Sequence, residues 1–240
     1  MLHTIRYGDH RVIVDMFTRE HGRVSFIVPL PKSGRGRMKR QYFQPLTLLA
    51  VSCDVRPQRQ LQTLTDASLL QPLPSLFTVP DKLSVAIFVS EFMYHALKGE
   101  QANAPLFDYV RSSIEWLDSC SGRYANFHLV FLMRLSRFLG FYPNLTSHHQ
   151  GVSEKTDSYF DLRAATFCSD VPLHRDFLMP AEAAHIHQLM RMDYSTMHLF
   201  RLTRAQRNRI LELLLLYYRL HLPDFPELRS VDVLHDLYDD

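Results

Sequence analysis

Five cationic side chains cluster within nine residues of the sequence, with no acidic residue between them: Lys32, Arg35, Arg37, Lys39 and Arg40. Gly34 and Gly36 keep the backbone between them adaptable, and strand-like apolar segments flank the cluster at 24–30 and 42–51. We therefore expect a charged loop between two strands of one sheet. Such cations can neutralise a polyanion and release its condensed counterions. The alternative is a solvated loop that keeps an edge strand soluble.

The distribution of charge along the chain favours the polyanion. The whole chain carries a net charge of only +2, but residues 1–60 hold eleven Lys and Arg against four Asp and Glu, an excess of seven. A local field of one sign attracts polyanions even when the molecule is nearly neutral. Arg6, Arg11 and Arg23 belong to this basic segment and are candidates to assist the loop. Together they predict binding of a nucleic acid.

Composition excludes several classes of protein. No apolar run approaches the roughly 20 residues that span a bilayer, and the first residues do not resemble a secretory signal. Three widely spaced cysteines, Cys53, Cys120 and Cys168, argue against a disulfide framework and predict a cytoplasmic protein. Neither GxxxxGK[ST] nor GxGxxG nor GxSxG occurs, so we expect no enzyme and no nucleotide cofactor.

The histidines and cysteines could in principle form a metal site. The candidates are His148, His149, Cys168, His185 and His187. The last two are two residues apart, which does not place them on one face of a helix, and no CxxC or HExxH pair occurs. Scattered surface and core histidines are the favoured interpretation, and we expect no metal.

The first 74 residues read as β-structure that must hold the basic loop. Alternation at 12–17 and strand composition at 24–28, 45–51 and 61–69 predict four or five short strands in a small barrel or bent sheet. Gly22 is placed in a turn that needs a positive φ.

Residues 75–240 are predicted to be helical, which makes the chain α+β. Asp81 is the expected N-cap of a mostly buried helix at 82–98, and further helices are expected from Pro105 and over 124–139, the latter ending at Gly140. Pro180 begins another helix, and the capping box at 203–206 begins the longest one. Between them, 145–178 is read as an irregular excursion with one strand-like piece at 158–162.

The sequence contains two further basic groups. Arg134 and Arg137 beside Phe138, Phe141 and Tyr142 could form a basic rim over an apolar floor that suits an acidic, hydrophobic peptide. More often, however, arginines at this spacing simply end a helix above an apolar core and form no binding site. A second group could form another anion site, but the solvated side of an amphipathic helix is favoured slightly; its members are Arg191, Arg201, Arg204, Arg207 and Arg209.

Five segments, taken in order, resemble landmarks of the RecO family of bacterial DNA repair proteins. They are LHTIRYGDH at 2–10, FT at 17–18, GRV at 22–24, QPLTLL at 44–49 and LGFYPNL at 139–145. The resemblance implies an N-terminal OB-fold at 1–74 followed by an α-helical domain at 75–240, and a non-enzymatic activity. It implies binding of single- and double-stranded DNA, annealing of complementary strands, and, in the RecF pathway with RecR, loading of RecA onto DNA covered by single-strand-binding protein (SSB).

The resemblance also implies partners and a location. Contact with the acidic C-terminal tail of SSB would give Arg134, Arg137, Phe138, Phe141 and Tyr142 a role. Whether RecF also takes part is left open. The implied location is the cytoplasm, in association with the nucleoid.

The sequence departs from the family pattern in two places. Many relatives carry a four-cysteine zinc module after the Gly-Phe-Tyr landmark, whereas this region has only Cys168, so we expect a metal-free remnant. Relatives also usually have several residues before the Leu-His stretch and use them for much of the first strand. Either this strand is short, which would leave the barrel open, or the start codon is misassigned.

The resulting hypothesis is a recombination mediator that binds DNA through the loop 32–40, assisted by Arg6, Arg11 and Arg23. Its cations would screen two phosphate backbones at once. The rival hypothesis is a protein-interaction adaptor whose basic loop binds an acidic partner and not DNA. A nuclease comes third, since the sequence has no ligand-like cluster of carboxylates.

Overall fold

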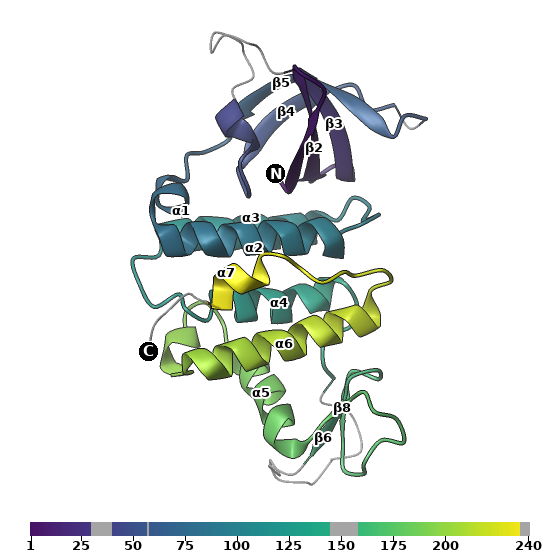
Figure 1. Cartoon of the computed structure of the whole chain (residues 1–240), viewed down its shortest axis with the longest axis vertical. Helices are drawn as coiled ribbons and strands as arrows, with labels where there is room; N and C mark the ends of the chain where they lie inside the picture. The colour runs from purple at the N-terminus through teal and green to yellow at the C-terminus, as the bar shows by residue number, and fades with distance from the viewer. Residues whose placement is uncertain (30–39, 57, 145–157, 236–240) are drawn as a thin grey trace. The chain divides into compact units, whose positions relative to one another are not determined.

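The computed structural model describes residues 1–29, 40–56, 58–144 and 158–235 (Figure 1). These residues form two compact units. Unit 1 comprises Met1–Cys120 together with the described residues from Glu227 on, and unit 2 comprises Ser121–Pro226. Unit 2 is therefore inserted, in sequence, between two segments of unit 1. The helices that follow residue 74 are divided between the two units.

Unit 1 contains a five-stranded mixed sheet with neighbour order β1-β2-β3-β5-β4. Its strands are β1 (His3–Tyr7), β2 (Arg11–Thr18), β3 (Gly22–Pro29), β4 (Leu49–Cys53) and β5 (Leu61–Leu69). β3 and β5 are parallel, and the other neighbours are antiparallel. Among the described residues β1 and β4 are the edges, so the sheet is not closed. The predicted number of strands and the α+β class are confirmed.

One predicted strand begins later than expected. The pattern at 45–51 predicted a strand, whereas the chain first forms the 3₁₀ turn η1 (Arg40–Phe43) and then bends at Leu46, whose φ is 59°. The strand β4 begins at Leu49. Short apolar runs around a turn do not reveal where the turn stops, which is why the boundary was misplaced.

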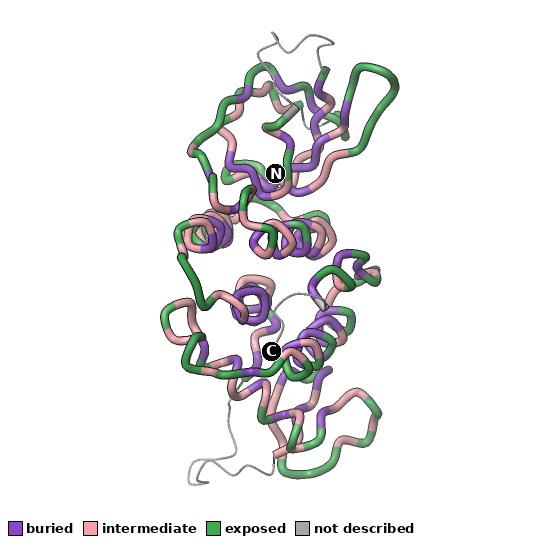
Figure 2. The backbone as a smooth tube through the Cα atoms, turned by 60° about the vertical axis from the view of Figure 1, so that its left-hand side comes forward, coloured by how far each residue is buried: buried purple, intermediate pink, exposed green. Residues whose placement is uncertain are grey.

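Side chains on the two faces of the sheet have different surroundings. Residues on the inner face, among them Val14, Phe26 and Val28, are fully buried in the core of unit 1. Because strand residues alternate between faces, the positions between them point outward. Figure 2 shows the resulting mixture of buried and exposed residues along the strands.

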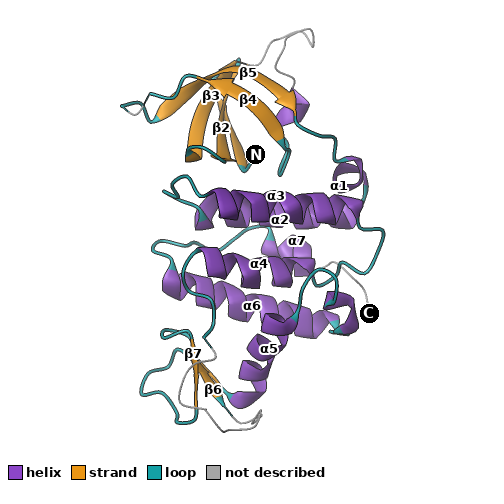
Figure 3. Ribbon diagram, turned by 180° about the vertical axis from the view of Figure 1, so that it is seen from behind, coloured by secondary structure: helices purple, strands orange, loops and turns teal. Residues whose placement is uncertain are grey.

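The helices of unit 1 are α1 (Pro74–Thr78), α2 (Pro80–Ala96), α3 (Ala104–Ser119) and α7 (Val231–His235). α2 and α3 lie side by side below the sheet (Figures 2 and 3). α2 is buried along most of its length, as predicted. Its predicted N-cap is wrong: Val79 occupies that position and Pro80 begins the helix, so Asp81 lies in the first turn instead.

The returning chain is fastened to α2 by one carboxylate. Glu91 accepts hydrogen bonds from the backbone N–H groups of Arg229 and Ser230, at 3.1 and 2.9 Å, and from the Ser230 hydroxyl. These bonds lie directly before α7. They hold the start of α7 against α2.

Unit 2 consists of three helices, one 3₁₀ turn and a small antiparallel sheet in its described residues. They are α4 (Phe127–Phe138), α5 (Pro180–Arg191), η2 (Met197–Leu199) and α6 (Arg204–His221), with β6 (Tyr159–Asp161), β7 (Thr166–Cys168) and β8 (Phe177–Leu178) in the order β7-β6-β8. Pro180 is in the first turn of α5, Thr203 and Gln206 form the predicted capping box, and Gly140 has a φ of 88° just after α4. These helix ends were predicted correctly.

The core of unit 2 forms where α4 meets α6. Tyr217 and Tyr218 are fully buried, and their hydroxyls donate to the carbonyls of Phe141 and Leu132. Phe141 packs against both tyrosine rings. Each buried hydroxyl therefore has an acceptor, as a buried polar group requires. No helix within the described ranges is long and apolar enough to cross a membrane.

One buried histidine makes the stability of unit 2 depend on pH. Burial, and next the charge of Arg207, lower the pKa of His128 from 6.5 to about 3. Below pH 6.5 the unfolded chain binds a proton that the folded chain does not. We therefore expect the free energy of unfolding to fall by up to about 1.4 kcal/mol per pH unit between pH 6.5 and 3.

Urea unfolding followed by far-UV circular dichroism at pH 7, 6 and 5 measures this slope. His128→Gln should make this slope shallower without abolishing it. The Met1 amino group, whose pKa burial lowers to about 5, and His95, whose pKa burial also lowers, contribute in the same direction over this range. Asp15 and Glu91 also have lowered pKa values, but their ordinary values are 3.8 and 4.5. These two carboxylates therefore change the free energy of unfolding only below about pH 5. Equal slopes for wild type and variant would contradict the assignment.

Candidate nucleic-acid interface

The predicted basic loop leaves the sheet at the end of β3. Lys32, Arg35, Arg37 and Lys39 lie outside the described residues, and so does the side chain of Arg40, whose backbone begins η1. The described chain stops at Pro29 and resumes at residue 40. The position of Pro29 therefore fixes where the loop starts.

Two predicted arginines lie at this same end of the sheet. Arg11 stands directly opposite Pro29, and Arg6 stands opposite Val12, which in turn stands opposite Val28. Both arginines are exposed, and within the described residues neither forms an ion pair. Their charges are thus available to an anionic ligand next to the start of the loop.

Arg23, the third predicted arginine, has a different setting at the opposite end of β3. One of its terminal nitrogens donates to the Tyr94 carbonyl at 2.5 Å, and the other lies 3.6 Å from the Asp15 carboxylate. Its guanidinium carbon lies 4.2 Å from the centroid of the Tyr94 ring. These contacts occupy the guanidinium and join the sheet to α2.

The carboxylate beside Arg23 is stabilised in its charged form. Burial raises the pKa of Asp15, but the neighbouring His3 ring at 3.8 Å, the hydrogen bond from Ser25 and the charge of Arg23 outweigh burial, and the net shift is downward. Asp15 thus stays ionised and pairs with Arg23. Arg23 is therefore engaged in contacts within unit 1. Of the three arginines predicted to assist the loop, only Arg6 and Arg11 are exposed.

The predicted peptide site in unit 2 is assembled only in part. The Arg137 guanidinium lies 4.3 Å from the centroid of the Tyr142 ring, and Arg137 is exposed. Arg134 donates to the Met192 carbonyl at 3.2 Å. Phe141 is 8% exposed and lies in the core, while Phe138 is half-buried. Arg137 and Tyr142 are therefore the members best placed to meet a partner.

The second basic group is partly engaged within unit 2. Arg209 pairs with Glu182 and with Glu212, and Arg207 is buried and donates to the Leu202 carbonyl. Ion-paired and buried arginines have little charge left for an external anion. The exposed, ion-paired Arg209 fits the favoured interpretation of a solvated helix face, whereas the buried Arg207 does not.

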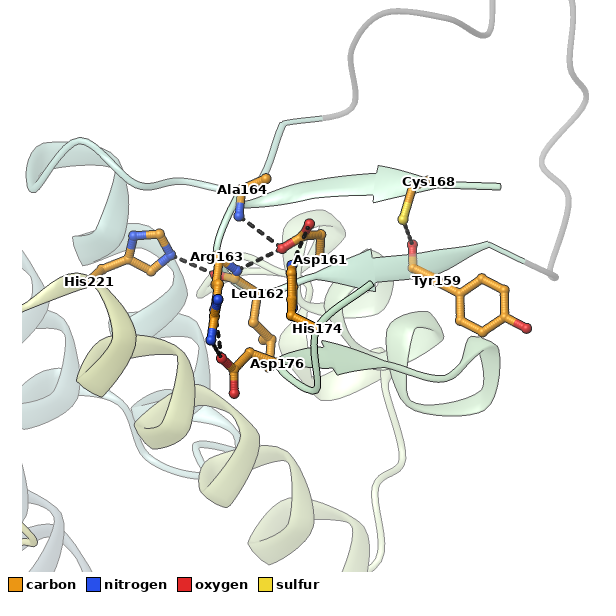
Figure 4. A network of polar contacts seen from close by, with 9 residues as sticks. All are labelled: Tyr159, Asp161, Leu162, Arg163, Ala164, Cys168, His174, Asp176 and His221. Atoms are coloured by element: carbon orange, nitrogen blue, oxygen red, sulfur yellow. Dashed lines mark hydrogen bonds and ion pairs between the residues drawn. The ribbon is translucent and has the colours of Figure 1, made fainter. Parts of the chain in front are cut away.

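The small sheet of unit 2 is held by a polar network centred on Asp161 (Figure 4). The Asp161 carboxylate accepts from the backbone N–H groups of Arg163 and Ala164, at 2.9 and 3.0 Å, and lies 3.2 Å from the His174 ring. The Arg163 side chain pairs with Asp176. Side-chain pairing and turn hydrogen bonds thus fasten strands that are only two or three residues long.

The predicted metal candidates take part in other contacts. The Cys168 thiol donates to the Tyr159 carbonyl at 3.8 Å, and the His187 ring stacks on Phe167. His148 and His149 lie outside the described residues. In the part of the chain that the structure describes, no three His, Cys, Asp or Glu side chains are grouped as ligands of a metal ion.

Sequence reasoning missed an exposed aromatic side chain beside Arg11. Tyr7 is exposed, and the Arg11 guanidinium lies 5.6 Å from its ring centroid. The alternation of His3, Ile5 and Tyr7 with polar residues was the available signal for a strand with one outward-facing apolar row.

Comparison with known proteins identifies relatives along the full chain. Residues 1–73 match the family model described as recombination protein O N terminal, and residues 78–230 match recombination protein O C terminal. A protein of Phocaeicola vulgatus is 48% identical over 99% of this chain and 96% of its own length. Proteins of Bacteroides fragilis and Porphyromonas gingivalis are 48% and 34% identical over 100% of this chain and 97% of theirs. All three are named DNA repair protein RecO.

Proposed function

This chain belongs to the RecO family of DNA repair proteins, and from that premise we propose that it is a non-enzymatic recombination mediator. It binds single- and double-stranded DNA, anneals complementary strands, and with RecR helps to load RecA onto DNA covered by SSB. DNA binding resides in residues 1–74, and the helices of 75–240 carry the partner contacts.

The observation that carries this proposal is the position of Arg6 and Arg11. The register places both where β3 ends and the five-cation segment begins. Neither has an acidic partner among the described residues. The five cations of the segment 32–40 follow β3 in sequence, and we propose that they act together with Arg6 and Arg11.

This concentration of charge suits annealing. Two complementary strands repel each other through their phosphates, and cations that contact both backbones lower that repulsion. Contacts to phosphate carry no sequence information, so any complementary pair can be aligned. The strands themselves then supply the specificity by base pairing.

For the partners, we propose that the acidic tail of SSB binds beside Arg137 and Tyr142. The exposed guanidinium can pair with a carboxylate, and the ring beneath it offers an apolar surface. Arg134 assists from its position on α4. Participation of RecF stays open.

The double substitution Arg6→Ala with Arg11→Ala tests the DNA site. We expect the affinity for a fluorescent single-stranded oligonucleotide to fall by about tenfold at moderate salt. The slope of log affinity against log salt should become shallower by about 1.4, because about 0.7 counterions are released per single-strand phosphate contact. Fluorescence anisotropy at several salt concentrations measures both quantities.

Arg111→Ala with Arg209→Ala is the matched control. It removes the same charge, but these arginines pair with Glu115 and with Glu182 and Glu212. Exposed ion pairs contribute little to stability, so the control should fold and bind as wild type. If both double variants lost the same DNA affinity, net charge and not a defined site would govern binding. If wild type binds an acidic peptide but no DNA, the adaptor hypothesis replaces this proposal.

A further inference from the structure

The outward face of the sheet has two unlike ends. Directly opposite residues of neighbouring strands point to the same side, so the register defines rows across the sheet. One outward row is His3–Asp15–Ser25–Leu61, the next is Ile5–Ile13–Ile27–Thr63, and the last is Tyr7–Arg11–Pro29. They alternate with the inward rows that form the core.

Helix α2 packs against the β1 and β2 part of the first row, at His3 and Asp15, whereas Leu61 at the other end of that row is exposed. The His3 ring contacts the Tyr94 ring of α2 with centroids 4.4 Å apart and the planes tilted by 41°, and Asp15 is buried. Two positions further along β1, Ile5 is 46% exposed, and Tyr7 at the next outward position is 47% exposed. Large apolar side chains at two successive outward positions form a continuous uncovered surface on β1, flanked by the half-buried Ile13 and Ile27.

This apolar surface is joined to positive charge. Arg11 stands opposite Tyr7 in the last row and lies over its ring at 5.6 Å. A ring face and a guanidinium side by side match the two parts of a nucleotide, since a base stacks on an aromatic ring while its phosphate pairs with a cation. A wholly apolar ligand would leave the Arg11 charge without a partner.

We propose that this outward surface, formed by Tyr7, Ile5 and Ile13, is a platform for two successive unpaired nucleobases of single-stranded DNA. The inference rests on the proposed DNA binding and deepens it by separating a base site from the phosphate site. Successive outward residues of a strand are about 7 Å apart, twice the 3.4 Å rise per nucleotide in duplex DNA. Bases reach both Ile5 and Tyr7 only when they are unstacked, so the platform selects single strands.

The test compares a short oligothymidine with an oligonucleotide of equal length made entirely of abasic sites. Both carry the same phosphates, but only the first has bases. Wild type should bind oligothymidine more tightly. Tyr7→Ala should lose about tenfold on oligothymidine and nothing on the abasic strand or on duplex DNA, since a stacked base contributes on that order. Tyr7→Phe keeps the ring and should bind as wild type.

Ile87→Ala, which removes an exposed apolar side chain from α2, is the matched control and should change none of these affinities. Thermal unfolding of each variant verifies that the fold is intact. Equal binding of the two strands by wild type, with no loss in Tyr7→Ala, would overturn the platform and leave the phosphate site standing. Failure of wild type to bind either strand would overturn both proposals. A changed oligomeric state in Tyr7→Ala, without a changed base preference, would make this surface an interface between copies and also overturn the platform.

Discussion

Lys82→Met should destabilise unit 1 by about 2–4 kcal/mol, because it removes the buried donor that three partly buried acceptors share. Lys82 is 2% exposed. Its ammonium donates to the Ser75 hydroxyl at 2.7 Å and to the carbonyls of Asp118 and Cys120 at 2.8 and 2.6 Å. The two carbonyls stand at the end of α3, where a helix carries partial negative charge. Methionine matches the length of lysine but cannot donate.

The measurement is urea unfolding followed by the fluorescence of Trp116, the single tryptophan of the chain, which lies on α3 in unit 1. Lys98→Met is the matched control, since Lys98 is exposed just after α2. That variant should unfold within about 0.5 kcal/mol of wild type. Equal stability of the two variants would show that the three contacts of Lys82 are dispensable.

Gly22→Ala should destabilise unit 1 by about 2–4 kcal/mol, for two reasons that can be separated. Gly22 has a φ of 67°, which costs energy for any residue with a Cβ atom. A Cβ there would also lie far inside van der Waals contact with the backbone of Glu100 and Gln101. To relieve the collision the hairpin must move, which strains the hydrogen bond from the Arg23 N–H to the Glu100 carbonyl, 2.9 Å long.

Gly8→Ala is the matched control for the backbone term alone. Gly8 has the same φ of 67°, but a Cβ there would meet nothing within 4 Å. Gly8→Ala should lower the free energy of unfolding by only about 1 kcal/mol. The difference between the variants, measured by the same Trp116 unfolding, isolates the contact between the hairpin and the α2–α3 connection. If the two variants lose equal stability, the collision is relieved without cost.

Local signals in the sequence predicted the ends of several elements. The capping box at Thr203, the proline that opens α5, and the glycines at 22 and 140 act through bonds and angles within a few residues, so their effect can be read without the fold. The N-cap of α2 was predicted wrongly because aspartate is common both at the N-cap and in the first turn of a helix. With Pro80 before it, Asp81 could not be assigned to one of these positions from the sequence.

The candidate site was less predictable, because its members are distinguished by partners distant in sequence. The sequence does not distinguish Arg6, Arg11 and Arg23 from one another. In the structure, however, Arg23 donates a hydrogen bond to the carbonyl of Tyr94, which lies 71 residues later in the chain. The burial of Lys82 was missed for the same reason, since its acceptors belong to other elements. The loop 32–39 itself lies outside the described residues, and its role stays a prediction.

The return of the chain from unit 2 to unit 1 has a consequence for how the protein is made. Residues 227–235 are synthesised after all of unit 2, yet their helix docks on α2, which was made long before. Until they emerge from the ribosome, the nascent chain holds an incomplete first unit with part of α2 uncovered. Completion of unit 1 is therefore a late, long-range event, and a ribosome that stalls within unit 2 leaves an apolar surface for chaperones to shield.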